Sequence, residues 1–117
     1  MTSSDVDALL PLPPATFHIL VALADGERHG YAIMQEVAAR TGGDLRLSPG
    51  TLYRSIQRML EQGLLAELTG KPAKGDDERR RYYRLTPFGR EVAQAETRRL
   101  AQLLKLARAS GFAPGKA

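Results

Sequence analysis

The sequence predicts a mainly α-helical fold with a small β-ribbon, an α+β fold that continues into a long C-terminal helix. Residues 48–62 follow a helical period, with one apolar face and one polar face that carries arginine. Two short strands at 64–69 and 82–86 flank a polar loop. Residues 87–110 keep an apolar helical row over roughly 30 Å. A helix followed closely by a basic β-ribbon is typical of a DNA-binding winged helix-turn-helix.

Length and charge narrow the function classes. The 117 residues suffice for one small domain but not for a large enclosed active site. Residues 1–45 hold 2 basic and 6 acidic groups, net −4, whereas residues 46–117 hold 15 basic and 7 acidic groups, net +8. This asymmetry favours a nucleic-acid partner, with a solvated basic surface as the open alternative. The chain has no cysteine, which excludes disulfides and thiolate metal sites.

Prolines and glycines delimit two helices before residue 48. An apolar segment follows Pro14 and stops at Asp25-Gly26, which predicts a first helix of about three turns. A second helix is predicted from His29-Gly30 to Arg40, with His29 as its cap and Gly42-Gly43 at its end. Its expected core stripe is Tyr31, Ile33, Met34 and Val37.

The helix at 48–62 has well-defined ends. Ser48 is a good N-cap, Pro49 suits the first helical position, and Gly63 supplies the left-handed residue that stops the helix. The apolar stripe consists of Leu52, Ile56, Met59 and Leu60. The opposite face carries Thr51, Arg54, Ser55, Arg58 and Gln62.

The ribbon and the last helix complete the predicted fold. The loop between the strands is longer than a tight turn, and we interpret residues 70–81 as a wing. Tyr83 and Leu85 should face the core. Thr86 should cap the last helix, which is too long for this core to cover. Its apolar row therefore predicts a homodimer, with contacts from Phe88, Val92, Leu100, Leu103, Leu104 and Ala107.

These elements give an expected division of the chain. Residues 1–12 form a flexible segment, 13–86 the winged-helix DNA-binding domain, 87–110 the dimerisation helix and 111–117 a disordered tail. The first residues lack the features of a signal peptide, and no run approaches the roughly 20 apolar residues of a membrane span. We therefore expect a cytoplasmic protein.

Four motifs resemble those of the PadR-type transcriptional regulators, and together they cover most of residues 15–92. They are His29-Gly30-Tyr31, Ser48-Pro49-Gly50-Thr51-Leu52-Tyr53, Gly63-Leu64-Leu65 and Arg81-Tyr82-Tyr83-Arg84-Leu85-Thr86-Pro87-Phe88-Gly89. The single C-terminal helix is similar to the short branch of that family. The resemblance implies a bacterial, nucleoid-associated repressor that binds a palindromic operator as a homodimer and leaves it on binding a small-molecule effector. It also implies DNA contacts by Thr51, Tyr53, Arg54 and the basic wing residues.

DNA chemistry extends this expectation. In a major groove, Arg54 or Arg58 could pair with guanine, and Gln57 or Gln62 with adenine. The first turn suits phosphate, whereas the wing-tip carboxylates Asp76-Asp77-Glu78 would stand off the backbone. The full expected DNA-binding set is Ser48, Gly50, Thr51, Tyr53, Arg54, Gln57, Arg58, Lys71, Lys74, Arg79 and Arg80.

Other functions have less support in the sequence. No nucleophile, base and orienting group can be placed together, so we expect no enzyme and no cofactor. His18 and His29 lack a spaced second ligand, and adjacent carboxylates at 76–78 rarely make a metal site. An effector pocket could involve Phe17, Phe88 and leucines of the last helix. The alternative function is a winged-helix module that binds another protein and has no specific DNA site.

Overall fold

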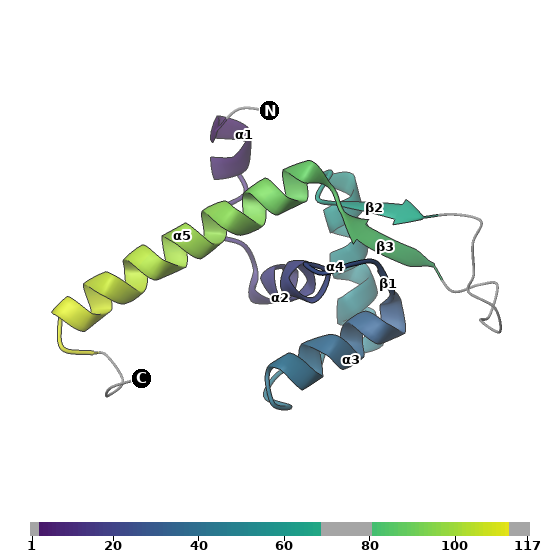
Figure 1. Cartoon of the computed structure of the whole chain (residues 1–117), viewed down its shortest axis with the longest axis horizontal. Coiled ribbons are helices and arrows are strands. Elements are labelled where there is room, and N and C mark those ends of the chain that lie inside the picture. The colour runs from purple at the N-terminus through teal and green to yellow at the C-terminus, as the bar shows by residue number, and fades with distance from the viewer. Residues whose placement is uncertain (1–2, 69–80, 113–117) are drawn as a thin grey trace.

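The computed structural model describes residues 3–68 and 81–112 and shows a helical domain with one small sheet (Figure 1). The predicted fold class is confirmed. The long helix α5 starts beside the sheet, crosses the domain and extends beyond it. In chain order the elements are α1 (Ser3–Asp7), α2 (Pro14–Ala22), β1 (Arg28–His29), α3 (Gly30–Arg40), α4 (Pro49–Glu61), β2 (Leu65–Leu68), β3 (Tyr82–Leu85) and α5 (Pro87–Ala109).

The core lies where α2, α3, α4 and the start of α5 meet. The apolar stripe of α4 is buried as predicted at Leu52, Ile56 and Met59. In α3 the prediction is wrong for Tyr31, whose side chain is 54% exposed. Ile33 is fully buried, and two residues along a helix turn the side chain by about 200°, so Tyr31 must point away from the core.

Short-range hydrogen bonds fix where the helices begin, as the sequence predicts. The Ala32 N–H donates to His29 Nδ1 at 3.1 Å, at the start of α3. The Thr51 N–H donates to Ser48 Oγ at 3.1 Å, at the start of α4. The Gly89 N–H donates to Thr86 Oγ1 at 2.9 Å, at the start of α5. Each bond satisfies one N–H group that the first helical turn leaves without an intrahelical partner.

The sheet is antiparallel, with strand order β1-β3-β2. Leu65 pairs with Leu85, and Glu67 pairs with Tyr83, whose side chain is buried as predicted. The sequence did not indicate β1, because two residues give no alternating pattern. The ring of His29 on β1 lies edge-on to Tyr82 on β3, with centroids 5.4 Å apart.

The start of α5 is locked against the end of α4. Thr86 Oγ1 donates to the Gly63 carbonyl at 2.6 Å, and the Thr86 N–H donates to the Leu64 carbonyl at 3.1 Å. Gly89 packs directly on that Leu64 carbonyl, where a side chain at residue 89 would overlap the oxygen. The backbone therefore sets the angle at which α5 leaves the domain.

The prediction of a flexible N-terminal segment is wrong for its described part. Residues 3–12 contain α1, which packs on α5, and they bury Val6 and Leu12. The Leu12 N–H donates to Glu96 Oε2 at 3.0 Å, and Arg99 Nε lies 2.6 Å from Glu96 Oε1. Glu96 is only 2% exposed. Its hydrogen bond with Arg99 outweighs burial and lowers the pKa of the carboxyl below its ordinary value.

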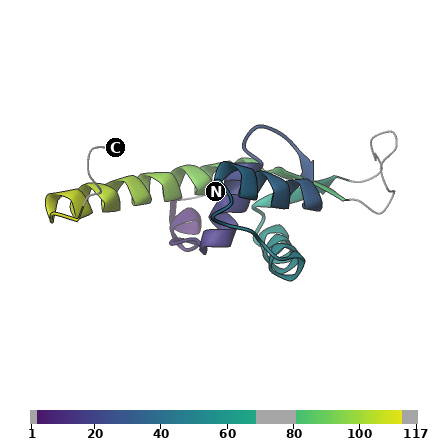
Figure 2. The same ribbon diagram turned by 90° about the horizontal axis from the view of Figure 1, so that it is seen from below.

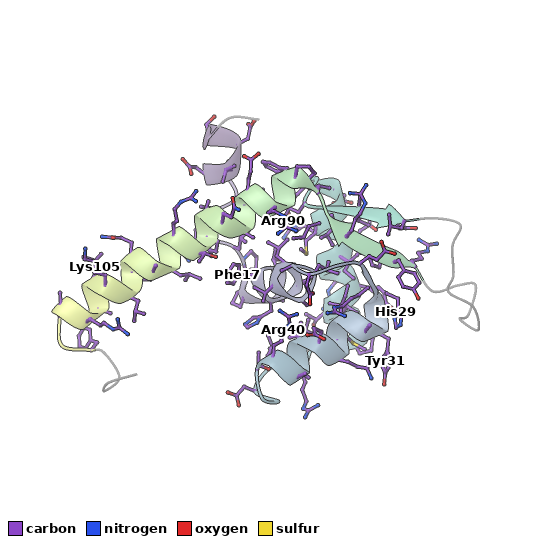
Figure 3. The ribbon with its side chains drawn as sticks, in the orientation of Figure 1. Phe17, His29, Tyr31, Arg40, Arg90 and Lys105 are labelled. Atoms are coloured by element: carbon purple, nitrogen blue, oxygen red, sulfur yellow. The ribbon has the colours of Figure 1, made fainter. Side chains whose placement is uncertain are left out.

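The two halves of α5 differ in burial, which corrects the predicted dimer contacts. Phe88 and Val92 are 8% and 0% exposed within this single chain, so they belong to its own core and offer little or no surface to a partner. The projecting half, which carries the labelled Lys105 in Figure 3, exposes Leu100, Leu103, Leu104 and Leu106. Ala107 is half-buried. Among the described residues, no helix is both long and apolar enough to traverse a bilayer.

Candidate nucleic-acid interface

Seven of the predicted DNA-binding residues lie between residues 48 and 58, at the start of α4 and along its exposed face. In Figure 2 this helix lies at the lower edge of the molecule, separate from the projecting half of α5. Only Thr51 is half-buried; the exposed members are Ser48, Gly50, Tyr53, Arg54, Gln57 and Arg58. The other members, Lys71, Lys74, Arg79 and Arg80, lie outside the described residues.

The arginines of α4 differ from those that stabilise the fold. Arg28 and Arg40 form ion pairs with Asp25 and Glu36. Arg40 is labelled in Figure 3. Arg99 forms an ion pair with Glu96. Within residues 3–68 and 81–112, Arg54 and Arg58 have no carboxylate within ion-pair distance. Two adjacent cations one helical turn apart are therefore available to an anionic partner.

Positive groups also converge at the first turn of α4. A Cβ built on Gly50 would lie 3.4 Å from Arg54 Nη1, so the guanidinium reaches back toward the helix start. The N-terminus of a helix carries partial positive charge and free N–H groups. Ser48 Oγ, however, already accepts the Thr51 N–H and donates to Thr51 Oγ1 at 3.1 Å. Of these two hydroxyls, only that of Thr51 keeps a proton to donate outward.

A groove of about 520 Å³ runs along one flank of α4. The start of α2 forms its opposite wall through Pro13 and Thr16. Sequence reasoning missed these two residues, because only the packing of α2 on α4 brings them beside the arginines. The α4 residues that line the groove are Thr51, Arg54, Ser55, Gln57 and Arg58.

Tyr53 lies on the other flank of α4 and contacts α3. Its hydroxyl and ring edge occupy the space where a side chain at Gly30 would stand. Gly30 therefore permits a close approach of α4 to the first turn of α3. The ring is still half exposed. The expected phosphate contact of the Tyr53 hydroxyl stays a prediction.

Sequence reasoning also missed Glu61, the exposed carboxylate in the last turn of α4. Gln57 Nε2 donates to Glu61 Oε2 at 3.2 Å. Glu61 follows Arg54 by seven residues and Arg58 by three, so helical periodicity alone would have placed it on the same face. The face is therefore basic but not uniformly so.

The described part of the chain offers no cluster of His, Cys, Asp and Glu side chains suited to a metal ion. His18 is half-buried on α2, and His29 caps α3. The carboxylates at 76–78 lie outside the described residues.

Sequence comparisons match most of the chain to one family. Residues 19–95 match the family model described as the transcriptional regulator PadR-like family. The chain is 40% identical over 88 residues to the transcriptional regulator Rv3488 of Mycobacterium tuberculosis, covering 75% of this chain and 77% of that protein. It is 39% identical over 85 residues to an uncharacterised 37.1 kDa protein in a Streptomyces fradiae transposon, and there it spans 73% of this chain but only 22% of the relative.

Structure comparisons show the same fold. A transcriptional regulator from Clostridium thermocellum superposes with a TM-score of 0.70 at 22% identity, over 93% of this chain and 96% of that chain. Bacillus subtilis PadR in complex with operator DNA superposes with a TM-score of 0.62 at 20% identity, over 71% of this chain and 46% of that chain.

Proposed function

The chain belongs to the PadR-like family of transcriptional regulators, which are not enzymes, and from this premise we propose that it binds duplex DNA sequence-specifically. The observation that carries the proposal is the pair of arginines on α4, Arg54 and Arg58, which meet no carboxylate among the described residues. B. subtilis PadR, a structural neighbour, is seen with operator DNA.

In the proposed complex, α4 lies in the major groove and residues 70–81 lie on the sugar-phosphate backbone. The major groove admits one α-helix and displays a donor and acceptor pattern that differs for each base pair. The outward ridge of α4 bears Arg54, Gln57 and Arg58, which can read that pattern. The first turn, with Gly50 and Thr51, suits a phosphate.

We further propose that the protein acts as a homodimer through the projecting half of α5. Leu100, Leu103 and Leu104 continue the face of α5 that Val92 and Glu96 occupy inside the domain. Burying each leucine would contribute about 1.5–3 kcal/mol. A two-fold dimer presents two α4 helices, so the operator should be palindromic, with half-sites about 34 Å apart or at a multiple of that distance.

Repression and release by an effector complete the proposal. A dimer that occupies an operator blocks that DNA for other proteins, which is the simplest route to repression. The effector would bind where α2 packs on α5, near Phe17, which is half-buried and labelled in Figure 3. Phe88, the other aromatic residue expected at an effector pocket, is buried in the core of the domain.

The test is selection of genomic fragments by the purified protein, followed by titration with salt. We expect enrichment of a palindromic sequence. If a dimer neutralises about 8 phosphates, the log–log slope of affinity against salt should be near −7. Weak binding with no preference for any fragment would contradict the proposal and favour the protein-binding alternative.

A further inference from the structure

Glu61 places a negative charge on the proposed DNA-binding face of α4, where only neutral or positive groups are expected. It is exposed on the face of α4 that holds Arg54 and Arg58, and a phosphate backbone would repel it. Arg58 precedes it by three residues, a spacing that allows an ion pair. The structure instead pairs Glu61 with Gln57, at 3.2 Å between Oε2 and Nε2.

We propose that Glu61 is a positioning residue that orients the amide of Gln57 to read an adenine, an inference that rests on the proposed DNA binding. A carboxylate accepts hydrogen bonds and has none to donate, so it must face the NH₂ end of the amide. The amide of Gln57 therefore cannot rotate to place its oxygen toward Glu61. Its Oε1 and its second N–H are then held in one known orientation.

That orientation matches adenine and opposes guanine. Adenine presents an N6 donor and an N7 acceptor in the major groove, which the Oε1 and the free N–H of Gln57 complement. Guanine presents acceptors at both positions, so its O6 would face the Gln57 oxygen. The preference for adenine therefore depends on both side chains, because the amide of Gln57 alone would rotate freely.

The expected contribution is moderate. Ordering a flexible side chain at an interface costs about 0.5–1.5 kcal/mol, which is about a two- to tenfold change in affinity. Glu61 removes that cost for Gln57 before DNA binds. In return its charge weakens the attraction to any duplex by about two- to threefold, as expected for one charge about 7 Å from a phosphate in water.

The test compares wild-type protein with Glu61→Ala, Gln57→Ala and the double variant, on duplexes that differ at single operator positions and on random duplex. Glu91→Ala is the matched control, because it removes one exposed carboxylate from α5. We expect Glu61→Ala to bind random duplex about two- to threefold more tightly and to lose about two- to tenfold of the adenine preference at one position in each half-site. A purely structural role would not move these two quantities in opposite directions.

The double variant decides whether Glu61 acts through Gln57. In the Gln57→Ala background, Glu61→Ala should cause no further loss at that position. An unchanged adenine preference in Glu61→Ala would overturn the inference. So would a lost preference at a different position, which would mean that Glu61 contacts a base itself. If wild-type protein prefers no sequence at all, the proposed function fails first, and the two failures are thereby distinguished.

Discussion

Helix α4 and the projecting half of α5 both present surfaces that the chain leaves uncovered, but the chemistry of the two surfaces is opposite. On α4 the exposed side chains are polar and include two arginines without a carboxylate partner among the described residues. On α5 the exposed surface includes four leucines between residues 100 and 106.

The difference between the two surfaces indicates two different partners. Water hydrates the arginines of α4, so their exposure costs little free energy. A polyanion can replace that water. Water disfavours the leucines of α5, so these favour an apolar partner. The fold separates the two surfaces (Figure 2). Each can therefore be altered without changing the other.

The largest effect is expected at the leucine surface. Leu103→Asp removes two buried leucines from each proposed dimer and should weaken association by about 3 kcal/mol or more. Sedimentation should then show a monomer, and tight operator binding should be lost. Lys105→Asp is the control, because two residues along the helix turn its side chain about 200° from Leu103. A Leu103→Asp protein that sediments as a dimer would refute this interface.

At the arginine surface the expected effect concerns DNA discrimination. Arg58→Ala should reduce the difference in binding free energy between operator and random DNA by about 1–3 kcal/mol, because it removes a proposed base contact. The unfolding free energy should not change. Arg98→Ala removes the same charge from an exposed position on α5 and should leave discrimination intact. Equal losses on both DNAs would instead make Arg58 a backbone contact.

The clasp at Glu96, by which we mean its bonds to the Leu12 N–H and to Arg99, marks where the buried half of α5 ends. Glu96→Ala should lower the free energy of unfolding by about 1–3 kcal/mol, since it leaves the buried Leu12 N–H without its acceptor. Glu96→Gln keeps an acceptor oxygen and should cost less. Denaturant titration measures both. Equal stability of the alanine variant and wild type would contradict the clasp.

The same carboxyl should make stability depend on pH. The pKa of Glu96 in the folded protein lies below its ordinary value of 4.5, mainly because of the hydrogen bond with Arg99. Its contribution is therefore present above about pH 4.5 and is lost as the pH falls through the lower folded-state pKa. Thermal melts between pH 3 and 7, about the range that contains this titration, should show a smaller acid-induced loss in Glu96→Gln than in wild type. Parallel curves would exclude this role.

The smallest effect is expected at the cap of α4. Ser48→Ala removes the acceptor of the Thr51 N–H and should destabilise the domain by about 1 kcal/mol. Ser55→Ala is a matched serine change inside α4, away from the cap. Equal stabilities of the two variants would show that the hydroxyl of Ser48 contributes nothing as a cap.

Helix ends and the two faces of α4 were predictable because their causes are local. A cap such as Ser48 or Thr86 bonds a group three residues away, and a buried stripe repeats every three or four residues. The same reasoning failed for Tyr31, since a stripe of adjacent apolar residues does not define which edge of α3 faces the core. The same reasoning overlooked Glu61, although the helical period places this residue on the same face of α4 as Arg54 and Arg58.

By itself the sequence determined the order of the main helices, the two strands of the ribbon and the polar face of α4, because neighbouring residues specify them. Only the tertiary structure decided that Phe88 and Val92 pack inside the domain, where α1 docks and what lies across the groove from Arg54. Those outcomes depend on contacts such as Leu12 with Glu96, 84 positions apart. No local pattern encodes them, because the partner of a side chain at that distance is set by how all the elements pack together.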